Sequence, residues 1–197
     1  MPAAEPASVV EVRNRQRDRP LDSRRVRTLA RAVLADLGCS GEVAFHFIPD
    51  HQMAQLNWHY LHHEGSTDIL TFDHGSRPGH LHGECFISVA EAVRQAAEFG
   101  TDWEREVVRY VVHGLLHLAG YDDLEPEARK RMKRVENRLT RRFAPRFPLA
   151  KGPGQPRQGA RGRQSRITTP RSAGAAGRTP PGRRGTRPAG NPARAPG

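Results

Sequence analysis

Residues 111–123 read VVHGLLHLAGYDD, an apolar stretch interrupted by His113 and His117 and closed by Gly120 and two aspartates. The apolar run predicts a helix, and Gly120 predicts its end, because glycine readily adopts the left-handed conformation that follows a last helical turn. The two histidines are four residues apart, so their side chains share one face of the helix, with Cβ atoms about 6 Å apart. A helix this apolar predicts a packed core around it.

On either side of this helix, strand and helix signals follow each other in the order βαβαββααα. Strands are predicted where β-branched and apolar residues cluster, at 9–13, 42–48, 67–72 and 84–88. Helices are predicted over 26–37, from 50, after Ser88, after Thr101 and from Pro126; Ser88 and Thr101 each precede a glutamate by three residues, as in a capping box. Strands come first and helices later, which favours an α+β fold: a small mixed sheet of about four strands with helices packed on it.

The positive charge of the chain is concentrated at its C-terminal end. Of the 32 Lys and Arg residues, 11 lie in residues 150–197, which contain no Asp or Glu. Residues 1–149 therefore hold 21 basic and 21 acidic side chains and are neutral overall. The C-terminal segment also holds 10 Gly and 8 Pro and lacks aromatic residues. Such a composition cannot bury enough apolar area to fold, which predicts a domain at 1–149 followed by a disordered basic tail at 150–197.

Several classes of protein are excluded or disfavoured by composition. No stretch approaches the roughly 20 apolar residues of a membrane span, and the first residues do not have the pattern of a secretory signal. Cys39 and Cys85 are too few for a disulfide framework or a Cys-x-x-Cys metal site. We therefore expect a cytoplasmic protein with reduced cysteines and no contact with membranes.

The spacing of His113 and His117 suits a pair of metal ligands on one helix face. Gly120 lets the chain double back, so that Asp122 or Asp123 can reach the same ion. Three protein ligands leave a position for water, as in catalytic zinc sites. The alternative is that both histidines are core residues bonded to neighbouring backbone. A second pair at the same spacing, His59 and His63, shows that spacing by itself is weak evidence.

Zinc proteases have a related helical motif, HExxH, in which the glutamate is the general base. In this chain Gly114 stands at the position of that glutamate. Glycine cannot take a proton, so peptide hydrolysis by that mechanism is disfavoured.

The run from His113 to Asp122 resembles the HGxLHLxGYD signature of the YbeY family of bacterial zinc-dependent endoribonucleases. The resemblance extends over most of residues 5–142 and includes four further motifs in the same order: Leu56-Asn57-x2-Tyr60, residues 67–72 (TDILTF), residues 83–88 (GECFIS), and Met132 with Glu136. It implies an α+β fold and one zinc ion per chain, bound by His113, His117 and Asp123 as the metal-binding and catalytic residues. It also implies cleavage of single-stranded RNA in maturation of the 16S rRNA 3′ end and ribosome quality control, with the small ribosomal subunit as partner.

Two departures from the family pattern concern the site. The usual third ligand is histidine, whereas this chain has Asp123, a harder, anionic ligand that lowers the charge of the bound ion. The family commonly has an arginine after the Leu-Asn-x2-Tyr motif, and this chain has Leu61. We expect a retuned or weakened site, with the missing cation replaced by another donor.

Candidate donors lie on two predicted helices. His59, His62 and His63 could contact phosphate when protonated, or could form a solvated helix end. Arg109 lies one turn before His113 and could contact phosphate, or could form a salt bridge with Glu106 three residues earlier.

The sequence thus predicts a metal-dependent endoribonuclease that acts on single-stranded RNA, with either water or the ribose 2′-OH as nucleophile. The alternative from another class is a ribosome-assembly or RNA-binding factor with a structural metal and little cleavage activity. A hydrolase for another substrate is a third reading. The tail has two readings: a non-specific RNA-binding segment, or a solubilising extension.

Overall fold

The computed structural model describes residues 8–150, which form four strands, five helices and a short 3-10 helix. They follow in the order β1 (Val9–Asn14), α1 (Ser23–Asp36), β2 (Ser40–Ile48), α2 (Asp50–Leu61), β3 (Ile69–Asp73), β4 (His80–Ser88), α3 (Val89–Phe99), α4 (Trp103–Leu118), α5 (Pro126–Phe143) and η1 (Ala144–Arg146). The predicted order βαβαββααα is confirmed.

The four strands form one mixed sheet in the order β1-β2-β4-β3. β1 pairs with β2 and β2 with β4 in parallel, whereas β3 pairs with β4 in the antiparallel direction. The two parallel pairings require crossovers, and α1 supplies the first of them. The predicted mixed sheet is therefore confirmed.

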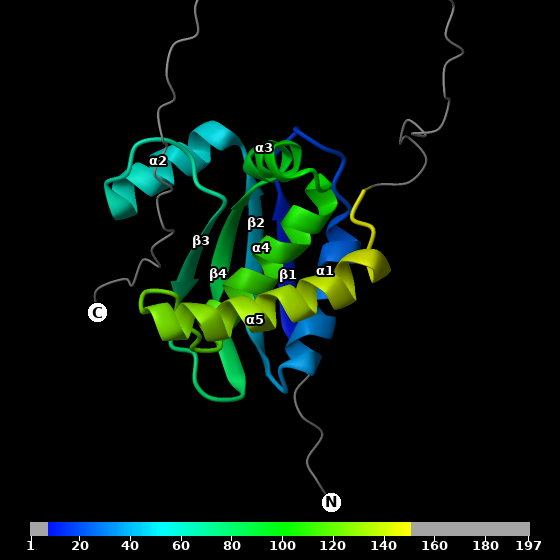
Figure 1. Cartoon of the computed structure of the whole chain (residues 1–197), viewed down its shortest axis with the longest axis vertical. Helices are drawn as coiled ribbons and strands as arrows, with labels where there is room; N and C mark the ends of the chain where they lie inside the picture. Colours follow the sequence, from blue (N-terminus) through cyan, green and yellow to red (C-terminus); the bar gives the residue numbers. More distant parts are fainter. Residues whose placement is uncertain (1–7, 151–197) are drawn as a thin grey trace, which may run out of the picture. The chain divides into compact units, whose positions relative to one another are not determined.

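Side chains alternate between the two faces of the sheet, and helices cover those faces unequally. One face carries Val43, Phe45, Cys85 and Ile87, all at most 3% exposed, and packs against α1 and α4 in the main core. Figure 1 shows α4 and α5 lying over this face. The other face is covered in part by α2, through a smaller apolar cluster of Ile48, Met53, Leu70 and Phe72. Much of that second face is left for polar side chains.

Gly114 lets α4 approach the sheet closely. A Cβ atom at this position would lie 2.6 Å from Sγ of Cys85 and 2.9 Å from Cδ1 of Ile69. Contacts that short cannot persist, so a side chain here would force Cys85, Ile69 or the helix itself to move. The glycine that stands in place of the protease glutamate thus allows the close packing of α4 on the sheet.

Two boundaries differ from the prediction. The predicted helix start after Ser88 is confirmed, since its side chain accepts a bond from the backbone N–H of Glu91, although the Ser88 N–H bonds to the Asp68 carbonyl and so does not complete a capping box. The one predicted at Thr101 is wrong: Asp102 is the N-cap of α4 and accepts from the N–H of Arg105, while Thr101 donates to Glu106. A carboxylate also interacts favourably with the positive end of the helix, which favours Asp102 over the neighbouring hydroxyl. β4 begins at His80, four residues before the predicted strand at 84–88, because its parallel pairing with β2 extends to Ser40.

The C-terminal end of the described chain is held to the domain. Leu149 accepts a backbone bond from Asp22, and Ala150 forms a bridge with Leu21. The predicted basic tail, apart from Ala150, lies outside the described residues. None of the helices in residues 8–150 has the length and hydropathy needed to cross a membrane.

Candidate metal centre

The structure brings together the three side chains that the sequence singled out. His113 and His117 project from the last two turns of α4, and Asp123 lies in the loop before α5. The two Nε2 atoms are 2.9 Å apart, and Nε2 of His117 is 3.9 Å from Oδ1 of Asp123. One ligand atom from each residue lies within 4.8 Å of the others.

Gly120 produces the turn that returns Asp123 to the helix. Its φ of 84° is in the left-handed region, and the backbone N–H of Tyr121 bonds back to the carbonyl of Leu116 at 3.0 Å. Asp122 is exposed and accepts a bond from the backbone N–H of Leu124. Of the two aspartates left open by the spacing, Asp123 is the one whose carboxylate joins the histidines.

Hydrogen bonds on the far side of each ring define which nitrogen carries the proton. Nδ1 of His117 is 3.2 Å from the backbone carbonyl of Tyr121, and Nδ1 of His113 is 2.9 Å from Oε2 of Glu136. A carbonyl can only accept and an ionised carboxylate can only accept, so both Nδ1 atoms are donors. When the rings are neutral, each Nε2 atom then carries a lone pair and no proton, and the two lone pairs face each other.

This arrangement fits a bound cation. Two lone pairs 2.9 Å apart repel each other unless a positive charge lies between them, and tetrahedral zinc holds two ligand nitrogens about 3.3 Å apart. Oδ1 of Asp123 is buried and has no hydrogen-bond partner among the described residues. Two imidazoles and a carboxylate are a common catalytic zinc donor set.

Burial and charge bias these groups toward ligand binding. Burial, followed by the neighbouring His113, lowers the pKa of His117 and leaves its ring neutral at pH 7. Burial would raise the pKa of Glu136, but the bond from His113 and the charge of Lys133 outweigh it and lower that pKa to about 2. Glu136 is therefore ionised and holds the His113 ring in the ligand tautomer.

Arg109 belongs to the support of the site. Its guanidinium lies 2.9 Å from Oε1 of Glu136, 3.1 Å from Oε2 of Glu106 and 3.1 Å from Oδ1 of Asn137. The predicted pairing with Glu106 is confirmed, inside a partly buried network. Arg109 thus positions Glu136, which positions His113.

The role of Glu136 was not predicted from the sequence, although a signal for it exists. In α5 the buried positions are Met132, Glu136, Leu139, Thr140 and Phe143, so a carboxylate falls within the apolar stripe of an amphipathic helix. Its side chain is 4% exposed. A charged residue at such a position needs a partner from another element.

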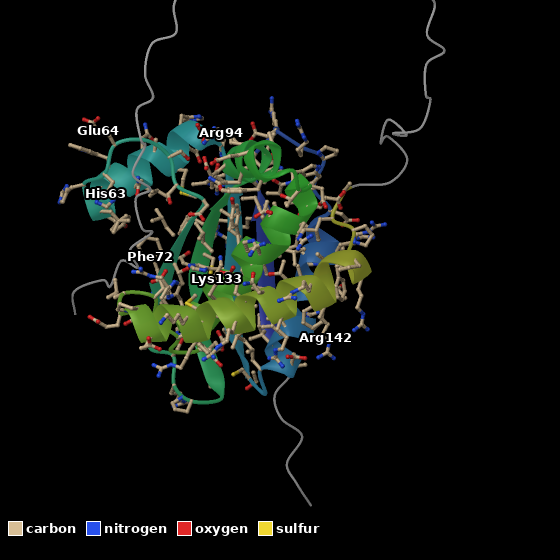
Figure 2. The ribbon with its side chains drawn as sticks, viewed as in Figure 1. His63, Glu64, Phe72, Arg94, Lys133 and Arg142 are labelled. Carbon is tan, nitrogen blue, oxygen red and sulfur yellow. The ribbon has the colours of Figure 1, made fainter. Side chains whose placement is uncertain are left out.

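The second histidine pair has a different environment. α2 ends at Leu61, and His62 adopts the left-handed conformation with φ 54°, so His63 lies beyond the helix. His59, His62 and His63 are exposed, as the solvated-end reading predicted. Figure 2 shows His63 beside Glu64 at this end of the molecule. Leu61 packs against the smaller apolar cluster.

The fold and this cluster define a small α+β protein with a candidate three-ligand metal centre of the hydrolase type. A family model described as "Endoribonuclease YbeY" matches residues 11–144. Among curated relatives with that name, the protein of Salinibacter ruber is 35% identical over 136 residues, covering 64% of this chain and 87% of the relative. The Bacteroides fragilis protein is 39% identical over 100 residues, covering 50% and 70%. The chain belongs to the YbeY family of endoribonucleases.

A solved structure has the same fold. The solution structure of TM1509 from Thermotoga maritima superposes with a TM-score of 0.52 at 19% identity, over 75% of this chain and 99% of that one. The likeness supports the α+β architecture.

Proposed function

We propose that this chain is a zinc-dependent endoribonuclease that cleaves single-stranded RNA during maturation of the 16S rRNA 3′ end. Membership of an endoribonuclease family supplies the reaction class. The observation that carries the metal dependence is the pair of Nε2 atoms 2.9 Å apart beside Oδ1 of Asp123, which is buried and has no hydrogen-bond partner in the described residues.

His113, His117 and Asp123 would hold the ion. A zinc ion held by three protein ligands supplies a Lewis acid and a bound water of lowered pKa. Glu136 and the Tyr121 carbonyl each accept a bond from Nδ1 and so orient the two rings with Nε2 toward the site. Asp123 adds a negative charge that histidine would not, so we expect a less acidic bound water than in a three-histidine site.

Alignment of the RNA requires cations near the site, and α5 provides them. This helix contains eight Lys and Arg residues and two glutamates, in a domain that is neutral overall. Arg131 and Arg134 are exposed, and neither side chain has a hydrogen-bond or ion-pair partner within residues 8–150. Lys133, labelled on the same helix in Figure 2, bonds to Glu136, which in turn contacts His113. We expect these cations to take the role of the arginine that the family pattern has at the position of Leu61.

The wider cellular role follows from the same proposal. We place the protein in the cytoplasm, acting on rRNA in the small ribosomal subunit and in ribosome quality control. The basic tail would add non-specific phosphate contacts outside the domain.

The second candidate function is a ribosome-assembly or RNA-binding factor with a structural metal. One observation favours it: Leu61 packs into an apolar cluster where the family pattern has a cation. This protein would bind RNA and zinc and would cleave poorly.

Cleavage of a labelled single-stranded RNA distinguishes the endoribonuclease from the assembly factor. We expect products from the native chain, none after chelation, and their return when zinc is restored. The variant His117→Ala should be inactive, and His59→Ala, which changes a histidine of the exposed pair, should be active. Normal RNA binding without zinc-dependent cleavage would favour the assembly factor.

A further inference from the structure

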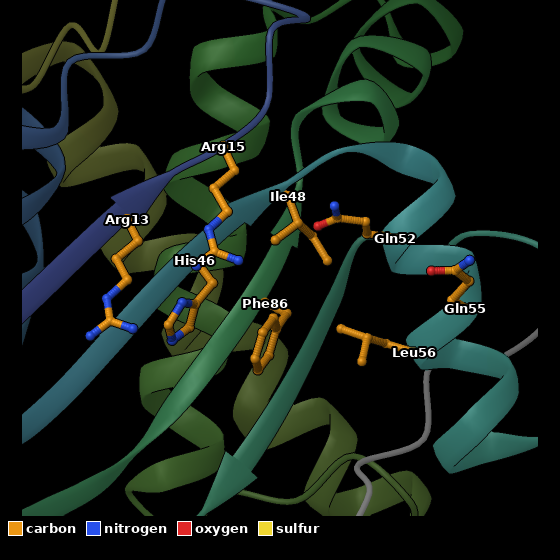
Figure 3. Close-up of a pocket in the computed structure, with 8 residues that line it drawn as sticks. All are labelled: Arg13, Arg15, His46, Ile48, Gln52, Gln55, Leu56 and Phe86. Atoms are coloured by element: carbon orange, nitrogen blue, oxygen red, sulfur yellow. The ribbon is translucent and has the colours of Figure 1, made fainter.

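A pocket of about 280 Å³ lies on the sheet face that α4 and α5 do not cover (Figure 3). It is formed by β1, β2, β4 and α2. Its lining combines cationic side chains, aromatic or apolar side chains, and amides. The lining residues are Arg13, Arg15, His46, Ile48, Gln52, Gln55, Leu56 and Phe86.

The pocket is separate from the candidate metal centre. His46 and Phe86 alternate along their strands with Phe45, Cys85 and Ile87, which face α4 in the main core. Successive side chains of a strand point to opposite faces, so the pocket opens on the other side of the sheet from His113 and His117. None of the proposed ligands lines it.

Two guanidinium groups stand at one side of the pocket. Arg13 and Arg15 are two residues apart at the end of β1 and point to the same face, as Figure 3 shows. Arg13 also bonds to Glu11, and both side chains are more than half exposed. The Arg15 side chain is exposed and has no ion-pair partner in the described part of the chain. The pair is thus available to an anion.

An aromatic wall faces these cations. The rings of His46 and Phe86 stack with centroids 4.6 Å apart at 16°, and Phe72 packs its ring edge-on to Phe86. Nε2 of His46 lies 3.0 Å from Oε2 of Glu84 but has no well-directed hydrogen bond within the described residues. Ile48 and Leu56 complete the apolar lining, and Gln52 and Gln55 add amides that both donate and accept.

We propose that this pocket binds one nucleotide of a single-stranded RNA, with the phosphate at Arg13 and Arg15 and the base against the His46–Phe86 wall. Cations beside a ring wall, with amides near the base edge, are the groups that bind unpaired nucleotides. The volume suits a single nucleotide and excludes a duplex. The RNA is the substrate of the proposed function, and the pocket anchors the strand away from the cleavage site.

A matched pair of charge variants tests the proposal. Binding of a uridine-rich RNA octamer to the full chain is measured over a range of salt, in chelator, so that metal-dependent cleavage does not occur. The double variant Arg13→Gln/Arg15→Gln should bind more weakly, and its log–log salt slope should be smaller by about 1.4, from two single-strand phosphate contacts. Arg24→Gln/Arg31→Gln removes the same charge from two exposed side chains of α1 that have no ion-pair partner among residues 8–150, and should match the native slope. Equal slopes for the two double variants would overturn the proposal.

The aromatic wall needs a separate measurement. Phe86→Leu keeps an apolar side chain but removes the ring, and we expect about tenfold weaker binding of the octamer. An octamer with 5-iodouridine should photocrosslink to peptides containing His46 or Phe86. Crosslinks confined to α5 or to residues 151–197 would overturn the proposal.

Two further measurements distinguish binding of an RNA strand from binding of a free nucleotide, and RNA binding from RNA cleavage. Uridine monophosphate at millimolar concentration should compete poorly; competition as strong as that of the octamer would make a free nucleotide the ligand and overturn the strand assignment. Because binding is measured without cleavage, loss of the proposed nuclease function would leave the pocket result intact. In a cleavage assay with zinc, Arg13→Gln/Arg15→Gln should raise KM and leave kcat near the native value.

Discussion

The two histidine pairs of this chain have the same spacing and opposite surroundings. His113 and His117 lie within α4, 24% and 9% exposed at their side chains, and each has an acceptor behind its ring. His59 and His63 straddle the end of α2, where His62 turns the chain out of the helix, and both are exposed. Two histidines at this spacing therefore form a candidate metal site only where the helix is continuous and hydrogen bonds fix the tautomer of each ring.

The largest effect should come from changing the partly buried pair on α4. His113→Ala or His117→Ala removes a first ligand, and we expect cleavage of single-stranded RNA to fall to the level of the chelated native protein. The matched change His59→Ala/His63→Ala should leave the rate within about twofold. Loss of activity in His59→Ala/His63→Ala would contradict the assignment of the metal ligands to α4 alone.

The third ligand should be exchangeable within limits. Asp123→Ala should release most of the metal, while Asp123→His should retain it and match the usual family form, with an equal or higher cleavage rate. Asp122→Ala is the control, since that carboxylate caps the N–H of Leu124 instead. Metal loss from Asp122→Ala but not from Asp123→Ala would reverse the assignment.

The acceptor behind His113 should tune the metal affinity. Glu136→Gln keeps the size of the side chain and removes its charge, so we expect about 10- to 100-fold weaker zinc binding by competition with a chromogenic chelator. The matched variant Glu127→Gln changes an exposed carboxylate on the same helix and should bind zinc normally. Equal affinities for the two variants would show that Glu136 is only structural.

Glu136 should also shape the acid stability of the metal-free chain. Its pKa is lowered to about 2 in the folded protein, so it stabilises the fold above its unfolded value near 4.5, and this contribution is lost as the pH falls toward 2. The full contribution is on the order of 3 kcal/mol. Urea unfolding of the chelated protein at pH 7 and pH 3 should show a smaller difference for Glu136→Gln than for the native chain. An unchanged pH dependence would contradict the pairing.

The smallest effect should come from the exposed cations of α5. Arg131→Gln/Arg134→Gln removes two groups without a protein partner in the described range, and we expect KM for RNA to rise a few-fold while kcat stays within about twofold. The salt slope of binding should fall by up to about 1.4. A native KM and slope would place the RNA elsewhere on the surface.

Local signals predicted much of this molecule, and pairings between distant segments account for what they missed. Hydrophobic periodicity gave the element order, and the run from His113 to Gly120 with the following aspartates gave the candidate ligands within one stretch of chain. The contact of Glu136 with His113 depends on how α5 lies across α4, and the pocket at Arg13 depends on the register of β1 with β2 and on α2. The prediction of Thr101 as the N-cap of α4 was wrong because Thr101 and Asp102 are both residue types that cap helices well. Which of them is the cap depends on where the helical backbone begins.

The metal centre is tested most directly by the zinc content of the purified chain and two variants, measured by elemental analysis after dialysis against metal-free buffer. We predict about one zinc per native chain, about one in His59→Ala/His63→Ala, and almost none in His113→Ala/His117→Ala, with circular dichroism showing that all three are folded. Zinc retained by a folded His113→Ala/His117→Ala variant, or lost when the exposed pair is changed, would contradict the assignment of the metal centre to α4.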